Sequence, residues 1–424
     1  MSTWIAKARE MSVPLLVGVM AAVAWANLHA ESYEAFVHWS PFGAHGPLSV
    51  HFVVNDLFMV FFFGIATKEI TEAVLPGGDL NPPRKAINPL LGTIGGVAGP
   101  VLVYLAYVHF AARADLMGGW GIPTATDIAL AWLVARLAFG PRHPAVSFLL
   151  LLAIADDAIG LVIIGAFYPD PNHPVEPVWL VLVAAAMGLA YLLRRRGVRS
   201  FWAYLAGPGV LSWSGLFLAH VHPALALVAV VPFMPNMGHD EGLFAELGDG
   251  HHHDDTLNRF ERFFAAPVDV GLLVFGLANA GVVFDAVGDA SWAVFVALLV
   301  GKTLGIFACS FGGHLAGFPL PGGMDGRALF VAGLTASIGL TVALFVAGVA
   351  FADPVLSGSA KMGALFSAAA APLVLAAARV LDVRGVRAPA PETAAPQATL
   401  EPARVGSMRP PSMRPSSLPP LMEE

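Results

Sequence analysis

Two adjacent carboxylates, Asp156 and Asp157, lie in the middle of an apolar run from Leu151 to Ile164 that contains no basic residue. A charge inside a membrane is costly, so such residues usually belong to an ion or proton pathway. Successive helical residues point about 100° apart, which lets both carboxylates border one cavity. Ionising two close carboxylates together is unfavourable, so a proton or a cation should compensate their charge. Carboxylate oxygens suit a hard cation such as sodium or lithium, and competition between this cation and protons would exchange one for the other.

A second polar motif, residues 123–127 (Pro-Thr-Ala-Thr-Asp), follows several glycines inside another apolar stretch. Proline and glycine both weaken a helix, and irregular backbone at membrane depth is tolerated only where it lines protein or a wet cavity. Asp127 could then neutralise the positive ends of interrupted helices. A matching polar break with a central glycine, Gly339, occurs at residues 337–341 (Ser-Ile-Gly-Leu-Thr).

A lone lysine, Lys302, lies within the apolar residues 298–305. An ammonium buried without a partner is expected to lose its proton. We therefore expect Lys302 to pair with Asp156 or Asp157. The alternative is that its side chain extends to the membrane interface.

Weaker candidates lie near the ends of apolar stretches. Asp56 begins one of them and could serve transport or lie at an interface. Lys68 and Glu69, together with Glu72, end the same stretch and form either a funnel mouth or a solvated face. His222 could titrate near neutral pH or act as a satisfied interfacial histidine.

The composition predicts a membrane protein, because 57% of the 424 residues are hydrophobic and only 12% are charged. The mean hydropathy is +0.70. A net charge of -7 argues against a nucleic-acid partner, and the single cysteine, Cys309, excludes a disulfide framework or a cysteine metal site. No cofactor is expected beyond the transported ions.

The apolar pattern predicts an all-α membrane protein with about twelve transmembrane helices of roughly 20 residues each. The expected spans are 11–30, 52–75, 88–110, 120–139, 145–168, 177–194, 201–219, 221–236, 263–284, 291–311, 326–351 and 359–381. Spans four and eleven carry the two breaks and hold corresponding middle positions in the triplets 3–5 and 10–12, as inverted-topology repeats would. Basic residues gather on one side, which places both termini in the cytoplasm.

The chain is expected to comprise a transmembrane domain at residues 1–382 and a disordered cytoplasmic tail at 383–424. The tail is rich in Pro, Ala, Ser and Met and has no apolar periodicity. A long cytoplasmic loop is expected at about 237–262, and it contains His251 to His253. These histidines could bind a metal or sense pH, but a plain solvated loop is the simpler interpretation.

From about residue 50 to 380 the chain resembles the NhaA family of bacterial sodium/proton antiporters. The motifs that carry the resemblance are Asn55-Asp56, Gly64 to Glu69, Pro123 to Ala129, Ala153 to Gly160, Phe275 to Val282, Gly301 to Gly305, and Ser337 to Thr341.

The resemblance implies a multi-pass protein of the bacterial inner membrane in which two broken helices cross. It implies that Asp156 and Asp157 bind the cation and the protons, and that Lys302 is the partner of Asp156. Thr126 and Asp127 would lie at the helix crossing. Family members exchange two protons for one sodium or lithium ion, serve pH and sodium homeostasis, and often form homodimers.

The departures from the family pattern concern the cytoplasmic funnel, which is linked to the pH response. Ala66 stands where a glutamate is usual, and Glu69 where an arginine is usual; Arg262 follows Glu261 where a histidine is common. Ion exchange is therefore expected to be intact, with a shifted or flattened pH profile.

Other functions are compatible with parts of the sequence. A sodium- or proton-coupled solute symporter or a cation channel would share the intramembrane acids. An intramembrane aspartyl protease would need a Gly-x-Gly-Asp element, which is absent, and a prenyl-transfer enzyme would need a third aspartate where Gly160 stands.

Overall fold

The computed structural model describes residues 13–43, 48–75, 78, 80, 83–169, 173–236 and 255–383. The regular structure of these residues is helical, without β-strands, which confirms the predicted all-α class. Most of the predicted loop, including His251 to His253, lies outside the described residues, as does the tail beyond residue 383. The expectations for both segments stay predictions.

Several helices are long and apolar enough to cross a bilayer, so the chain is a multi-pass membrane protein. Among the described residues, 6 helices meet this criterion, or up to 8 segments if each of two bent helix pairs is one span. The 6 helices are Val50–Val74, Ala86–Phe110, Pro144–Phe167, Pro177–Arg195, Asp289–Leu315 and Pro354–Val380. The predicted number of about twelve is not confirmed, because the other expected spans are shorter, bent or interrupted.

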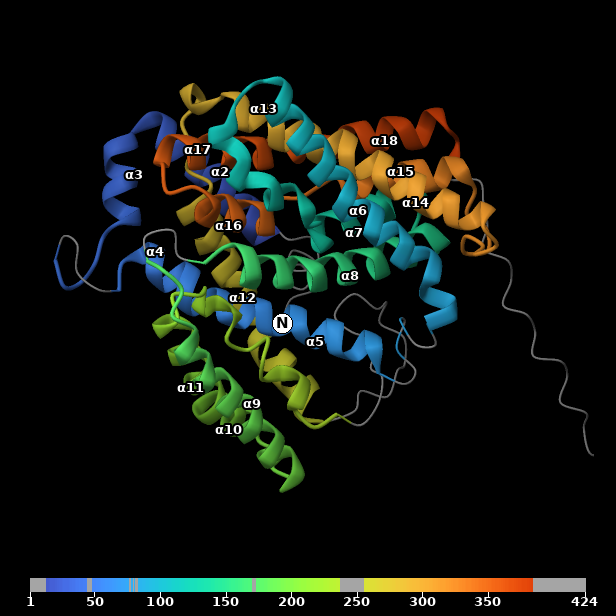
Figure 1. The fold of residues 1–424 in the computed structure, drawn as a ribbon. Helices are drawn as coiled ribbons and strands as arrows, with labels where there is room; N and C mark the ends of the chain where they lie inside the picture. The colour runs from blue at the N-terminus through green and yellow to red at the C-terminus, as the bar shows by residue number, and fades with distance from the viewer. Residues whose placement is uncertain are drawn as a thin grey trace, which may run out of the picture. The chain divides into compact units, whose positions relative to one another are not determined.

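The helices form two groups that meet where α5 packs against α8 and α12 packs against α16. The first group includes α9 to α11, which lie together in green in Figure 1. Its helices are α2 (Val13–Leu28), α3 (Ala30–Val37), α4 (Val50–Phe52), η1 (Val53–Phe58), α5 (Met59–Val74), η3 (Pro177–Trp179), α9 (Leu180–Arg195), α10 (Phe201–Tyr204), η4 (Leu205–Gly209), α11 (Val210–Leu218), η5 (Pro223–Leu225), η6 (Val231–Phe233) and α12 (Thr256–Asn279).

The second group contains both broken helices and, as described below, the buried aspartate pair and Lys302. Its helices are α6 (Pro83–Phe110), η2 (Ala114–Thr124), α7 (Ile128–Phe139), α8 (Pro144–Phe167), η7 (Phe284–Ala286), α13 (Asp289–Val296), η8 (Ala297–Lys302), α14 (Thr303–Leu315), α15 (Gly326–Ala336), α16 (Thr341–Ala350), α17 (Pro354–Ser367) and α18 (Ala370–Val380).

One predicted span does not form a continuous helix. Residues 221–236 contain turns and the two short 3-10 segments η5 and η6. Pro223, Pro232 and Pro235 remove backbone donors and limit helix growth. Many of the side chains between them are buried, including Leu227 and Val230. Protein therefore surrounds this irregular backbone, which is the condition for tolerating it at membrane depth.

Both helix breaks lie where the sequence predicted them. The 3-10 helix η2 and the α-helix α7 meet at an angle of 60° across residues 125–127, and α15 and α16 meet at 49° across residues 337–340. The first half of the fourth span begins at Ala114 rather than near residue 120, because its glycine-rich stretch adopts 3-10 geometry from there on.

The two breaks cross each other in direct contact. The backbone N–H of Asp127 donates to the carbonyl of Ile338 at 2.8 Å. A Cβ atom at Gly339 would lie only 2.8 Å from the carbonyl oxygen of Ala125. Any larger residue would push the two chains apart, so the crossing needs glycine at this position.

Helices α6 and α14 approach each other unusually closely through glycines. A Cβ atom on Gly95 would lie 2.0 Å from the carbonyl oxygen of Gly305, and one on Gly99 would lie 2.2 Å from that of Gly301. Small residues allow such backbone contact between membrane helices. The Gly99–Gly301 contact holds η8, which ends at Lys302, against α6.

Candidate functional site

Asp156 lies on α8 at the centre of a buried polar cluster. Its Oδ2 atom is 2.8 Å from Lys302 Nζ and accepts a hydrogen bond from Thr126 Oγ1 at 2.8 Å. The side chains of Asp156 and Lys302 are both 0% exposed. The cluster therefore joins three elements in one site: α8, the break between η2 and α7, and the end of η8.

Lys302 reaches this site from a π-helical turn. Its Nζ atom also donates to the carbonyl oxygen of Thr124 at 2.5 Å. This carbonyl is available because η2 ends at Thr124. A buried ion pair is tolerated only when such additional hydrogen bonds satisfy its donors. Because the lysine is fully buried and points inward, the alternative of an interfacial side chain is wrong.

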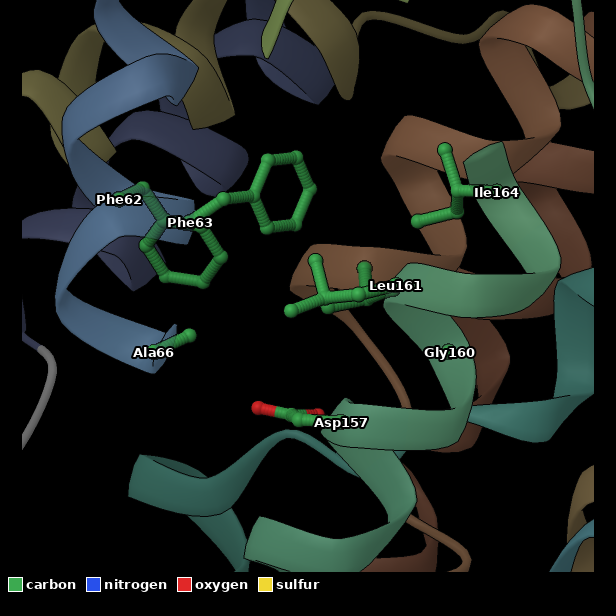
Figure 2. A pocket seen from close by; sticks show the side chains of 8 residues that line it. Phe62, Phe63, Ala66, Asp157, Gly160, Leu161 and Ile164 are labelled. Carbon is green, nitrogen blue, oxygen red and sulfur yellow. The ribbon is translucent and has the colours of Figure 1, made fainter. Parts of the chain in front are cut away.

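Asp157 has a different environment from its neighbour. It is 9% exposed, and it lines a small cavity of about 10 Å³. Figure 2 shows its carboxylate pointing from α8 towards Ala66 on α5. The other residues around the cavity are Phe62, Phe63, Gly160, Leu161, Ile164 and Val342. Within the described structure, the Oδ1 atoms of Asp156 and Asp157 have no hydrogen-bond partner. Each aspartate therefore has one oxygen that can bind a proton or a cation.

Asp127 joins the two broken helices through its carboxylate. Oδ1 accepts from the N–H of Leu130 at 3.1 Å and caps α7. Oδ2 accepts from the N–H of Thr341 at 3.2 Å and from the Thr341 hydroxyl, at the first turn of α16. Negative charge at a helix N-terminus is favourable, and here one carboxylate serves two N-termini.

Replacing Asp127 with alanine is expected to lower the free energy of unfolding by about 1–3 kcal/mol for each buried donor left unpaired. Asp127→Asn keeps an acceptor oxygen and should lose less. Denaturant unfolding of the two purified variants in detergent measures the difference. Equal stability of the alanine variant and the unchanged protein would contradict this role.

A second charged cluster surrounds Lys68 near the end of α5. Its Nζ atom lies 2.7 Å from Glu72 Oε2 and 3.5 Å from Glu69 Oε1, and it also pairs with Glu261 of α12. Lys68 is 0% and Glu72 is 3% exposed. The interpretation of these residues as a solvated face is therefore wrong: Lys68 ties α5 to α12 inside the protein.

Lys68→Met is expected to destabilise the fold by about 3–5 kcal/mol, because it leaves buried carboxylates without their cation. Glu69→Gln is the matched control, since Glu69 is the most distant partner and the most exposed, at 13%. It should cost much less. Unfolding curves of both variants in the same detergent measure the two losses of stability. A Lys68→Met protein as stable as the unchanged protein would refute the stabilising role of Lys68.

Asp56 and His222 lie close to each other, outside the two clusters described above. His222 Nδ1 is 3.9 Å from Asp56 Oδ1, and both residues line a cavity of about 480 Å³. Asp56 precedes Lys68 by a helical distance of about 18 Å. The residues expected to contribute to a funnel or a pH response are Asp56, Lys68, Glu69, His222 and Glu261. In the structure they separate into an Asp56–His222 pair and the Lys68–Glu69–Glu261 cluster.

Sequence reasoning missed several groups that hold the site in place. They are the Thr341 side chain, the Thr124 carbonyl, Tyr168 and Ser367. Ser367 of α17 accepts from the N–H of Gly339 at 3.2 Å and so supports the second break. Thr341 and Thr124 belong to the polar motifs already noted, whereas no local pattern distinguishes Tyr168 or Ser367.

Comparison with known proteins gives this geometry a context. The family model described as Na+/H+ antiporter 1 matches residues 2–379. The chain belongs to the Na+/H+ antiporter 1 family. The resemblance inferred from the motifs is thereby confirmed, and it extends over nearly the whole predicted membrane domain.

Relatives of this Na+/H+ antiporter 1 chain are similar over almost their full length. The Na(+)/H(+) antiporter NhaA of Geobacter sulfurreducens is 57% identical over 379 residues, covering 89% of this chain and 98% of the relative. The protein of the same name from Desulfitobacterium hafniense (strain DSM 10664 / DCB-2) is 55% identical over 380 residues, covering 89% and 96%. That of Jannaschia sp. is 43% identical over 413 residues, covering 88% and 96%.

Two of the departures that the resemblance implies have clear positions in the structure. Ala66 lines the cavity beside Asp157, where a glutamate would add a second acidic group. Glu69 lies 3.5 Å from Lys68 and adds to the negative charge around it, where an arginine would repel it. These contacts place both departures next to charged groups of the candidate site.

Proposed function

We propose that the chain is an electrogenic antiporter that exchanges protons for intracellular sodium or lithium across the bacterial inner membrane. Family membership supports the exchange of sodium for protons. The single observation that supports the site is the pair of buried aspartates on α8, each with one carboxylate oxygen unpartnered in the described structure. We also expect a homodimer, as the resemblance implies.

In the proposed cycle, protons and one cation compete for the oxygens of Asp156 and Asp157. A sodium ion entering from the cytoplasm takes up carboxylate oxygens that would otherwise carry protons, because both neutralise the same buried charge. Lys302 neutralises part of this charge at Asp156, so the pair need not carry two uncompensated charges at any stage. Protons arriving from the other side then displace the cation.

Two carboxylates and one monovalent cation account for an unequal exchange. If both acids take up protons when the cation leaves, each cycle moves two protons against one sodium ion. One net positive charge then crosses the membrane per cycle, so the exchange is electrogenic.

Access to the pair would alternate through the broken helices. Irregular backbone at the centre of two crossing helices lets one group of helices move against the other around a fixed site. Asp127 keeps both half-helix ends attached to each other during this movement. The basic residues favour cytoplasmic termini, since short cytoplasmic loops carry an excess of Lys and Arg.

A solute symporter is the second candidate, and the cavity next to the carboxylates argues against it. At about 10 Å³ this space is of the order of a single water molecule. The 480 Å³ cavity is large enough for a small solute, but its lining includes Asp56 and His222 rather than the α8 pair.

The test is an ion-exchange assay in liposomes that contain the purified protein and an internal pH dye. After a pH gradient is imposed, sodium, lithium or potassium is added outside, from mildly acidic to alkaline pH. Sodium or lithium should collapse the gradient, and clamping the membrane potential should accelerate the collapse if the exchange is electrogenic. No response to any cation at any pH would refute the antiporter, and a steep alkaline activation would refute the expected shift in pH profile.

A further inference from the structure

A single tyrosine connects the end of α8 to the interrupted fourth span. Tyr168 follows α8 directly and is 5% exposed. Its hydroxyl donates to the carbonyl oxygen of Gly118 at 2.9 Å and accepts from the N–H of Gly121 at 2.7 Å. A Cβ atom on Gly121 would lie 2.6 Å from this hydroxyl and ring, so the tyrosine is packed directly against the backbone of η2.

Gly121 in turn is linked to the ion pair. Its carbonyl oxygen accepts from the Thr124 hydroxyl at 2.8 Å. The Thr124 carbonyl accepts from Lys302 Nζ at 2.5 Å, and this ammonium lies 2.8 Å from Asp156 Oδ2. A continuous path of hydrogen bonds, joined through the backbone of Gly121 and through Thr124, thus runs from the Tyr168 hydroxyl to the carboxylate that we propose binds ions.

We propose that Tyr168 is a positioning residue for cation binding, which it controls by fixing the Thr124 carbonyl against Lys302. The inference rests on the proposed function of the aspartate pair. The Thr124 carbonyl shares the lysine ammonium with Asp156. When this carbonyl is correctly placed, the ammonium binds Asp156 less tightly. An incoming cation can then bind the carboxylate oxygens more easily.

Removing the hydroxyl should therefore weaken cation binding more than turnover. In Tyr168→Phe, the end of η2 loses two anchoring hydrogen bonds and the Thr124 carbonyl is held less firmly. The ammonium then binds Asp156 more tightly and competes better with the cation. We expect KM for sodium to rise about three- to tenfold, the effect of one modest hydrogen bond, with kcat nearly unchanged.

The chain offers a matched control, a second buried tyrosine whose hydroxyl also bonds to η2. Tyr104 of α6 is fully buried, and its hydroxyl donates to the Leu116 carbonyl of η2 at 2.8 Å, near the opposite end from Lys302. Tyr104→Phe also removes a tyrosine hydroxyl that bonds to η2, but this hydroxyl is not part of the path from Tyr168 to Lys302. Its KM for sodium should stay close to that of the unchanged protein.

The experiment compares sodium dependence in liposomes for the unchanged protein, Tyr168→Phe, Tyr104→Phe and Gly121→Ala. The added methyl of Gly121→Ala should displace the tyrosine ring and raise KM as Tyr168→Phe does. Equal KM values in Tyr168→Phe and Tyr104→Phe, or a loss confined to kcat, would overturn the inference while leaving antiport intact.

Hydrogen exchange of the same proteins in detergent gives a readout that does not depend on transport. Backbone amides at Gly121, Ile122 and residues 124–127 should exchange faster in Tyr168→Phe than in Tyr104→Phe. Unchanged exchange there would overturn the anchoring role. If the unchanged protein exchanges no ions, the proposed function fails, and hydrogen exchange still decides whether Tyr168 holds η2.

Discussion

Asp157→Asn is expected to reduce cation-evoked proton movement to the rate seen in liposomes without protein. The amide has nearly the same shape as the carboxylate, so the cavity beside Ala66 should keep its form. However, an amide cannot release a proton when a cation binds, and its oxygen carries no charge to hold the cation. The measurement is the sodium-evoked collapse of an imposed pH gradient.

Asp115→Asn is the control for this loss. Asp115 is an aspartate with a side chain 46% exposed, paired with Arg113 on the surface. Surface ion pairs contribute little to stability, so this variant should fold and exchange ions normally. Substantial exchange by Asp157→Asn, or equal loss in both variants, would contradict a specific role of Asp157.

Lys302→Met is expected to lower the free energy of unfolding by about 3–5 kcal/mol, because it leaves the carboxylate of Asp156 buried without its cation. Methionine has a similar length and should fill the same space between α8 and the fourth span. Unfolding of the purified variant in detergent measures the loss.

The double variant Asp156→Asn/Lys302→Met separates charge pairing from packing. With both charges removed, most of the lost stability should return, because replacing a whole buried ion pair by neutral groups is often harmless. Exchange should not return with it. A double variant as unstable as Lys302→Met alone, or a single variant as stable as the unchanged protein, would show that the pair does not stabilise this site.

The central part of the fold and site could be predicted from sequence because it depends on local physical rules. Acids in an apolar run indicated Asp156 and Asp157. Glycines and polar residues in two spans, together with Pro123 in the first of them, indicated the breaks that the structure contains. These signals arise within short segments, where composition and spacing determine whether a regular helix can continue.

The remaining features depend on contacts between distant segments. Lys68 appeared to end a span near solvent, yet it is buried because α12 supplies Glu261. Tyr168 contacts Gly121 across 47 residues, and Lys302 contacts the Thr124 carbonyl across 178. No pattern along the chain indicates such pairs. The prediction of a continuous helix at 221–236 was wrong for a related reason. Its apolar residues are buried by neighbouring parts of the protein, although they do not form a regular membrane helix.

The most direct test of the account is whether sodium binding itself releases protons from the protein. Sodium chloride, and choline chloride as a control, would be added to the purified protein in weakly buffered detergent solution that contains a pH dye. We expect an acidification with sodium that choline does not produce and that Asp157→Asn abolishes. Sodium binding without proton release, or equal release by Asp157→Asn, would contradict competition of the two ions for the aspartate pair.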